Sequence, residues 1–492
     1  MKGGVAMTET MGRRDFLKAA GLATALGQAA LAGGFGERLA SDRPNIIFIM
    51  ADDLGYAELG CYGQKRIETP NIDRLAAEGM RFSDCYSGSA VCAPARCILL
   101  TGRHGGHAYI RNNSEVGEWD SFRGQLPLPA ETFTVAELLK RRGYVTGAFG
   151  KWGLGEVGST GDPLNQGFDR FFGYNCQRHA HNLHPRYLIR DREKVVLEGN
   201  ARGLTGKRYA PQAIADELLA FIRQNKDRPF FAYYPTILPH LALQVPEADL
   251  AQYKGRWPET PYTGKSYLPH PTPRACYAAM ISFLDRQVGR VMELLHQEGL
   301  DRDTIVFFTS DNGTTHLREQ VDVEFFESVG PLRGLKGSLY EGGIRVPMIA
   351  RWPGRIRPGS VSDHPAVHYD MLATLANVVG IQRPSETDGV SLLPVLLSTP
   401  AGQEQREHLF WDFAGYGGQI AVRMGRWKGI KQGLVKNPDA PLELYDLETD
   451  IGERRNVAGE HPEIAARIEQ IMVEARTRPT VEAFRFGRYR DG

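Results

Sequence analysis

The sequence has little excess charge of either sign and no long hydrophobic run. Its 492 residues hold 59 Lys plus Arg against 58 Asp plus Glu, a formal net charge of +1. This balance argues against a basic nucleic-acid binder and against an acidic, solvating chain. No segment offers the ~20 uninterrupted apolar residues of a membrane-spanning helix. A hydrophobic content of 42% is typical of globular proteins and excludes a disordered chain.

Cysteine is also scarce. The six cysteines, at positions 61, 85, 92, 97, 176 and 276, are too few for a disulfide framework in a chain of this length. Their spacings do not form the paired CxxC pattern of a zinc site. Any disulfide would therefore only add to the stability of a fold that forms without it, and one of the cysteines could instead take part in catalysis.

The first 32 residues are expected to be a targeting segment. Arg13 and Arg14 precede a small, mildly apolar stretch that closes on Ala30-Leu31-Ala32, the A-x-A form that signal peptidase favours. This segment is similar to a twin-arginine signal. It predicts export by the twin-arginine machinery to the periplasm or beyond, and the mature chain would carry a charge close to neutral.

Short apolar runs alternate with helical stretches, which predicts a large mixed, mostly parallel sheet flanked by helices. Buried strands are expected at residues 46–50, 144–149, 230–234 and 305–309. Polar residues follow each of these runs: Asp52-Asp53, Gly150-Lys151, His240 and Asp311-Asn312. Because ligands bind beyond the carboxyl ends of parallel strands, all four segments are expected at one crevice.

The pattern of apolar and polar residues changes after about residue 395. Short strands of an antiparallel sheet are expected at residues 408–411, 421–431 and 442–446, with a covering helix over 462–476. Earlier helices are expected from a capping box at Thr134–Glu137 to Arg142, over 274–300 and over 369–379. We therefore predict a catalytic domain over 43–395 and a smaller C-terminal α+β domain over 400–492.

Two pairs of side chains with oxygen atoms, each at a strand end, suggest a site for a hard cation. Asp52 and Asp53, with Asp311 and Asn312, supply the oxygen ligands that Ca²⁺ or Mg²⁺ needs, without the His and Cys that zinc prefers. Either pair alone would be read as a helix cap or a turn. The two pairs together favour a metal site.

Cys92 opens a predicted helix. Pro94 suits the first turn, and the helix is expected to stop at Gly102. The helix dipole favours negative charge at Cys92, and Arg96 adds a positive charge near the same face. Such a site fits a nucleophile that attacks an anionic ester, whereas Cys92 alone would be read as a buried structural cysteine.

The order of these motifs resembles that of the formylglycine-dependent type I sulfatases of the alkaline phosphatase superfamily. The likeness rests on Cys-x-Pro-x-Arg at 92–96, followed by Leu-Thr-Gly-Arg at 100–103. Further segments agree in order: Gly150-Lys151-Trp152, Gln-Gly-Phe-Asp at 166–169, Pro239-His240, Lys-Gly-Ser at 336–338 and the run at 341–347. The resemblance covers nearly all of the mature chain and implies an alkaline phosphatase-like fold with sulfuric ester hydrolase activity.

The resemblance also implies roles for single residues. Cys92 would be oxidised to formylglycine by a formylglycine-generating or anaerobic sulfatase-maturing enzyme, and its hydrate would be the nucleophile. The implied ligands of Ca²⁺, with Mg²⁺ less favoured, are the modified Cys92, Asp52, Asp53, Asp311 and Asn312. The groups implied to hold the formylglycine and the sulfate, or to assist the leaving oxygen, are Arg96, Lys151, His240 and Lys336.

One departure from the family pattern is Gly153. The family usually reads Gly-Lys-Trp-His-Leu-Gly, so the histidine assigned to deprotonating the sulfated hydrate is absent here. Either another base serves or turnover is lost. His179 and His181 are the best candidates, although both could merely line the substrate pocket, together with Arg178 and Asn113.

Other functions stay open at this point. A phosphodiesterase or phosphonate monoester hydrolase would use the same scaffold, because sulfate and phosphate esters share a tetrahedral anionic geometry. A non-catalytic protein that binds sulfated glycans would explain Gly153, but the intact motif at Cys92 argues against it. We expect the substrate to be a small sulfated carbohydrate or an aryl sulfate.

Overall fold

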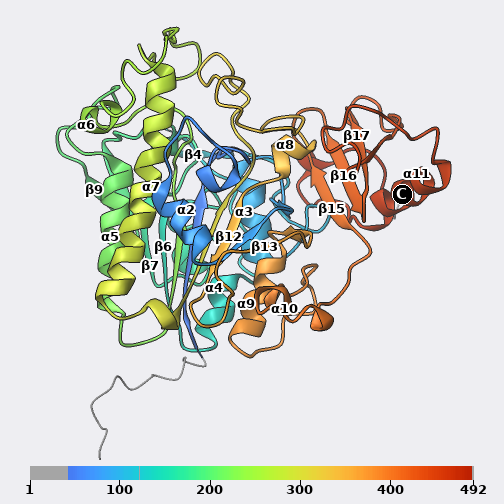
Figure 1. The fold of residues 1–492 in the computed structure, drawn as a ribbon, viewed down its shortest axis with the longest axis horizontal. Coiled ribbons are helices and arrows are strands. Elements are labelled where there is room, and N and C mark those ends of the chain that lie inside the picture. The colour runs from blue at the N-terminus through green and yellow to red at the C-terminus, as the bar shows by residue number, and fades with distance from the viewer. Residues whose placement is uncertain (1–42, 121, 490–492) are drawn as a thin grey trace, which may run out of the picture. The chain divides into compact units, whose positions relative to one another are not determined.

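A ten-stranded sheet runs through the part of the chain that the computed structural model describes, residues 43–120 and 122–489 (Figure 1). Its strands, in their order across the sheet, are β13 (Ser360–Ser362), β2 (Met80–Phe82), β12 (Met348–Arg351), β11 (Thr304–Ser310), β1 (Asn45–Ala51), β10 (Phe230–Pro235), β6 (Val145–Lys151), β7 (Arg170–Tyr174), β8 (Tyr187–Arg190) and β9 (Glu193–Val196). The segment 1–32, where the twin-arginine signal is predicted, lies outside the described residues.

The four strands expected from the sequence are neighbours at the centre of this sheet. β11, β1, β10 and β6 pair in parallel, with Phe48 opposite both Tyr233 and Phe307. β1, β10 and β11 are largely apolar runs that are buried on both faces, as is typical of central parallel strands. The sheet is mixed, since β12, β2, β8 and β9 join in antiparallel pairs. The predicted fold class is confirmed, and the carboxyl ends of the four central strands meet at one edge.

Alternate residues of β1 enter two different cores. Ile46, Phe48 and Met50 pack on one face of the sheet, and Ile47 and Ile49 pack on the other. Helices cover both faces (Figure 1). The first face is covered by α3 (Cys92–Thr101), α4 (Val135–Lys140) and α9 (Asp370–Val378), and the second by α2 (Pro70–Ala77), α5 (Ala210–Gln224) and α7 (Pro273–Gln297).

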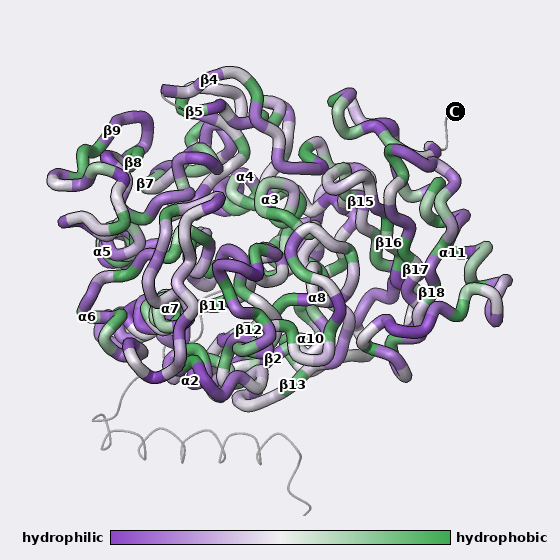
Figure 2. Tube along the Cα trace, turned by 90° about the horizontal axis from the view of Figure 1, so that it is seen from above, coloured by the Kyte–Doolittle hydropathy of each residue, from purple (hydrophilic) through white to green (hydrophobic). Residues whose placement is uncertain are grey.

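The helix α3 is buried along its whole length. All ten of its residues are buried, which is uncommon for a helix on the face of a sheet. Figure 2 shows α3 as a hydrophobic segment that lies inside the fold. Its position is therefore fixed by packing on all sides.

The predicted capping box of α4 also forms, because Thr134 and Glu137 each accept a hydrogen bond from the other's backbone N–H.

A four-stranded antiparallel sheet follows in the C-terminal region. It consists of β15 (Leu409–Phe413), β16 (Gln419–Met424), β17 (Trp427–Gln432) and β18 (Glu443–Asp446), and α11 (Pro462–Glu474) packs on it. The expectation of a single strand over 421–431 is wrong, because this stretch contains parts of two strands, β16 and β17. The chain reverses at Gly425, whose φ of 58° suits the first position of a two-residue hairpin turn. The domain division near residues 395–400 stays a prediction.

Buried ion pairs tie this small sheet to the segment that follows Lys336. The Nζ atom of Lys428 in β17 lies 2.7 Å from Glu341 Oε1 and 3.0 Å from Glu453 Oε1, and all three side chains are fully buried. Glu341 begins α8 (Glu341–Ile344), a few residues after Lys336. Because unpaired charges are costly to bury, this contact fixes the C-terminal sheet beside the segment that carries Lys336.

The remaining elements are short. They are α6 (Glu247–Leu250), α10 (Leu393–Leu396) and the paired strands β3 (Cys85–Tyr86) with β14 (Ala366–Val367) and β4 (Glu118–Trp119) with β5 (Phe122–Arg123). Among the described residues, no helix combines the length and the apolar character needed to cross a membrane.

Candidate active site

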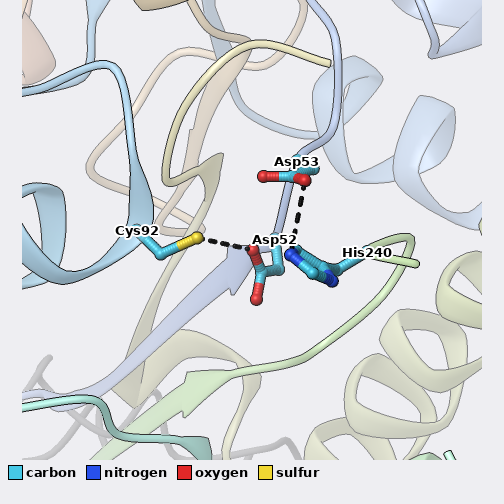
Figure 3. A group of neighbouring side chains, drawn as sticks. All are labelled: Asp52, Asp53, Cys92 and His240. Atoms are coloured by element: carbon cyan, nitrogen blue, oxygen red, sulfur yellow. Dashed lines mark hydrogen bonds and ion pairs between the residues drawn. The ribbon is translucent and has the colours of Figure 1, made fainter. Parts of the chain in front are cut away.

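Side chains from separate segments converge beyond the carboxyl ends of β1 and β10. Asp52 and Asp53 directly follow β1, His240 follows β10, and Cys92 begins α3. One possible ligand atom from each of these four residues lies within 4.8 Å of the others (Figure 3). All four side chains are buried, so their charges interact in a medium of low effective dielectric.

Cys92 occupies the first position of α3, as the sequence predicts. No side chain of Val91 caps the helix, and the Ala93 N–H instead donates to Asn113 Oδ1 at 2.9 Å. The Sγ atom of Cys92 lies 3.3 Å from Asp52 Oδ1 and 3.4 Å from Lys336 Nζ. Burial, and then Asp52, raise the pKa of the Cys92 thiol. The thiol is therefore held neutral and is a poor nucleophile in its own right.

Three cationic side chains surround the cluster. Lys151 Nζ lies 2.7 Å from Asp52 Oδ2, and Lys336 Nζ lies 2.7 Å from Asp53 Oδ1. Arg96 reaches the same carboxylate, with its Nη2 atom 3.3 Å from Asp52 Oδ2. Burial alone would raise the pKa of Asp52, but Lys151 and the other cations hold it well below its usual value. Asp52 is therefore a carboxylate throughout the neutral pH range.

Oxygen atoms suited to a hard cation meet next to Asp53. The Asp53 N–H donates to Asp311 Oδ1 at 3.1 Å, and Asn312 Nδ2 donates to Asp53 Oδ1 at 2.7 Å. The other amide atom, Asn312 Oδ1, is buried and has no hydrogen-bond partner among the described residues. Burial, and then Asp52, raise the pKa of Asp311, as expected for crowded carboxylates. An unpartnered amide oxygen beside three carboxylates fits Ca²⁺ or Mg²⁺.

His240 presents one ring nitrogen to this cluster. Its Nδ1 lies 2.5 Å from the carbonyl oxygen of Leu241 and must donate to it, which leaves Nε2 as an acceptor 3.6 Å from Asp53 Oδ2. The ring stacks on His181, with centroids 5.1 Å apart and an interplanar angle of 16°. Burial, and then neighbouring positive charges, lower the pKa of both histidines well below 6.5. Both rings are therefore neutral at neutral pH.

The three candidates in the loop 178–181 have different surroundings. His181 reaches the cluster through His240. The ring of His179 lies among aromatic rings, 4.9 Å from Tyr174 and 5.1 Å from Phe122. Arg178 is exposed and pairs with Glu115. Of these three, only His181 is brought beside the residues around Cys92.

The space beside Gly153 is filled by a residue from the same loop. Gly153 has a φ of 80°, and a Cβ atom added there would lie 2.3 Å from Gln177 Nε2. That Nε2 atom is buried and has no hydrogen-bond partner among the described residues. Gln177 could not be singled out from the sequence, because its only distinction there is its nearness to His179 and His181.

Two family models match this chain. The model described as Sulfatase matches residues 44–381, and that of the N-sulphoglucosamine sulphohydrolase C-terminal region matches residues 335–478. Arylsulfatase A of Homo sapiens is 36% identical over 479 residues, covering 87% of each chain. N-acetylgalactosamine-6-sulfatase of Canis lupus familiaris is 34% identical, covering 81% of this chain and 73% of its own.

Solved structures agree with these matches. Ps i-CgsB in complex with k-i-k-neocarrahexaose has a TM-score of 0.73 and 27% identity, covering 87% of this chain and 92% of its own. The phosphonate monoester hydrolase of Agrobacterium radiobacter has a TM-score of 0.61, covering 87% of this chain and 94% of its own, but at 21% identity it shows the fold alone. The class that these structures share with the chain is an α/β fold built on a large mixed sheet. The chain belongs to the sulfatase family of sulfuric ester hydrolases, which confirms the resemblance seen in the sequence.

The contact between Gly153 and Gln177 can be tested by protein stability. Gly158 also has a positive φ, 78°, but a Cβ atom added to it meets nothing within 4 Å. Gly158→Ala should therefore cost only the backbone strain, about 1–2 kcal/mol of unfolding free energy. Gly153→Ala should cost a further ~1 kcal/mol, because the buried end of the Gln177 side chain must shift to make room.

Urea unfolding of both variants measures this difference. Adding Gln177→Ala to Gly153→Ala should recover most of the extra cost, while adding it to Gly158→Ala should not. Equal losses in Gly153→Ala and Gly158→Ala would show that Gln177 does not fill the space beside Gly153.

Proposed function

We propose that the protein removes sulfate from a sulfated carbohydrate, with a formylglycine made from Cys92 as the nucleophile. The observation that carries this proposal is the position of Cys92. Cys92 is buried at the positive end of α3. Its Sγ atom lies 3.4 Å from Lys336 Nζ and 3.3 Å from Asp52 Oδ1. Cationic groups beside a nucleophile suit an ester that carries negative charge.

The chain's own groups supply the steps. One hydroxyl of the formylglycine hydrate gives its proton to the Asp52 carboxylate, whose Oδ1 atom lies 3.3 Å from Cys92 Sγ, and its oxygen attacks sulfur while the bond from sulfur to the sugar oxygen breaks. The ammonium of Lys336 stabilises the negative charge on the leaving oxygen and gives it a proton, with His240 beside it. Lys151 and Arg96 hold the sulfated intermediate. Division of one difficult displacement into two steps is the advantage of covalent catalysis.

The second step needs a base, and we propose His181. The remaining hydroxyl of the sulfated hydrate loses its proton, a carbonyl bond forms, and the bond from carbon to the sulfate oxygen breaks to release sulfate. His181 is neutral, and no described residue forms a hydrogen bond with its ring nitrogens. It stands beside His240 and comes from the loop whose Gln177 fills the space at Gly153.

A divalent cation is also proposed. The residues that would hold it are Asp52, Asp53, Asp311, Asn312 and the modified Cys92. Bound there, a Ca²⁺ ion would act as a Lewis acid that draws charge from the sulfate oxygens. The unpartnered Asn312 Oδ1 supports this proposal.

The substrate class and the export route are proposals as well. The matched proteins are named for an aryl sulfate and for N-acetylgalactosamine 6-sulfate, and a similar structure was solved with a carrahexaose. These names favour a sulfated sugar. Conversion of Cys92 would need a formylglycine-generating or anaerobic sulfatase-maturing enzyme. The predicted signal at 1–32 would carry the protein through the twin-arginine machinery.

Conversion of Cys92 can be observed directly. Protein made together with a formylglycine-generating enzyme should yield a 92-containing peptide with the mass of the aldehyde, and Cys97 in the same peptide should stay a thiol. Cys92→Ala should abolish aryl sulfate turnover, whereas Cys97→Ala should keep it. Active protein with an unmodified Cys92 would contradict the mechanism. Faster turnover of an aryl phosphodiester than of an aryl sulfate would favour the phosphodiesterase alternative.

Cation binding can be tested without turnover. Ca²⁺ at about 100 times its Kd should stabilise the folded protein by roughly 2.7 kcal/mol, which raises the thermal midpoint. Asp53→Asn should lose this shift because it removes a carboxylate of the ligand set. Asp388→Asn is the matched control, since Asp388 pairs with His107 in a separate cluster. An equal shift in both variants would place the ion elsewhere.

The role of His181 can be separated from substrate binding by steady-state kinetics. His181→Ala should lower kcat by about 10²-fold with little change in KM, because it removes a proton acceptor. His184→Ala is the control, since the His184 ring bonds to the Arg208 carbonyl instead. A rise in KM with an unchanged kcat would show that His181 only lines the pocket.

A further inference from the structure

Tyr416 is the one exposed residue among the phenylalanines, tryptophans and tyrosines that the structure describes. Its exposed fraction is 61%, and it lies in the turn between β15 and β16. Its φ is 51°, a conformation that is uncommon for residues other than glycine. Its hydroxyl has no hydrogen-bond partner among the described residues, and its nearest rings are His316 at 5.7 Å and Phe413 at 5.9 Å.

The ring of Tyr416 lies against the residue that follows Lys336. A Cβ atom added to Gly337 would meet the Tyr416 ring at 2.9 Å, so only a glycine lets the ring lie this close. Lys336 itself lies 3.4 Å from Cys92 Sγ. The C-terminal sheet therefore presents an exposed ring beside a cation of the site. Burial raises the pKa of Tyr416, and the charges of Lys336 and Asp53 also act on it.

A second tyrosine reaches the same groups from another part of the chain. The ring of Tyr267 is 5.4 Å from His181 and 6.1 Å from His240. Lys336 and Asp53 act on the pKa of Tyr267 as they do on that of Tyr416. The two rings therefore come from separate segments: Tyr267 lies against the histidines of the site, and Tyr416 lies against Gly337, next to Lys336. Tyr267 is packed on histidines, whereas Tyr416 keeps most of its surface open.

This arrangement sets the place of the leaving group. Cys92 is 1% exposed, so a substrate must present its sulfate inward and its alcohol outward. In the proposed function Lys336 stabilises the leaving oxygen, and the group attached to that oxygen must then lie beyond Lys336 on the open side. The exposed ring of Tyr416 lies against Gly337, the residue that follows Lys336.

We propose that Tyr416 is a stacking platform for the sugar ring whose oxygen leaves, and that it selects sulfated sugars over inorganic sulfate. This inference rests on the proposed function. The apolar C–H face of a pyranose would pack on the aromatic face, while the free tyrosine hydroxyl and the ring edges stay in contact with water. A tyrosine held in a left-handed conformation with most of its ring exposed adds little to the core, which favours a role in binding.

The test measures binding to the unconverted protein, which needs no turnover. The probes are N-acetylgalactosamine 6-sulfate, glucosamine 6-sulfate and inorganic sulfate, titrated by calorimetry. Tyr416→Ala should weaken the binding of one or both sugar sulfates by roughly 5- to 10-fold. It should leave inorganic sulfate unchanged, because sulfate alone does not extend past Lys336. Tyr416→Phe should bind like the wild type, since it keeps the aromatic face.

Val435→Ala is the matched control, because Val435 is 58% exposed in the same C-terminal region and lies near Gly418. Val435→Ala should leave the binding of all three probes unchanged. An equal loss of sugar sulfate and inorganic sulfate in Tyr416→Ala would show an electrostatic or structural effect and overturn the proposal. Unchanged binding of both sugars, or a wild type that binds neither, would overturn it too.

The proposed function is tested separately by turnover of an aryl sulfate after conversion of Cys92. Turnover with no effect of Tyr416→Ala on sugar binding would reject the platform alone. A loss specific to the sugars in a protein that never turns over a sulfate ester would support the platform as a binding surface and reject the sulfatase mechanism.

Discussion

The parallel pairing of β11, β1, β10 and β6 is the constraint on which the site depends. It aligns four carboxyl ends, so that Asp311, Asp52, His240 and Lys151 arrive at one edge from segments far apart in the sequence. The fully buried α3 then places Cys92 against that edge. Because the strands are buried on both faces and the helix on all sides, none of these positions can shift without disturbing the core.

Electrostatic balance is the second requirement. Three cations, Arg96, Lys151 and Lys336, face three carboxylates, Asp52, Asp53 and Asp311, and nearly all of these side chains are excluded from water. Buried charges of one sign would be too costly, so each sign has to be matched locally. In the proposed function, the anionic ester and the divalent cation would preserve this balance, since their charges would offset each other within the same cluster.

The central strands and the position of Cys92 could be predicted from the sequence because they depend on local patterns. Apolar runs that end in polar residues mark the central strands, and Cys92 stands between a proline-containing first turn and a glycine stop. The loop residues could not be placed in the same way. His179 and His181 are two residues apart, yet one lies among aromatic rings and the other on His240, because their directions depend on tertiary packing. The turn at Gly425 was missed because one glycine within an apolar run gives a weak signal.

The role proposed for Tyr416, in the turn between two strands of the C-terminal sheet, could not be predicted from its local sequence. Tyr416 sits among glycines in a hairpin turn, where a tyrosine has no local reason to matter. The buried Lys428 contacts fix the sheet to α8, and α8 closely follows Lys336 and Gly337. A rigid link from β17 to the segment of Lys336 makes the position of a turn residue relative to the site reproducible. The near-neutral net charge of the chain therefore says little about its ligand, because recognition depends on how local charges and one exposed ring are held together.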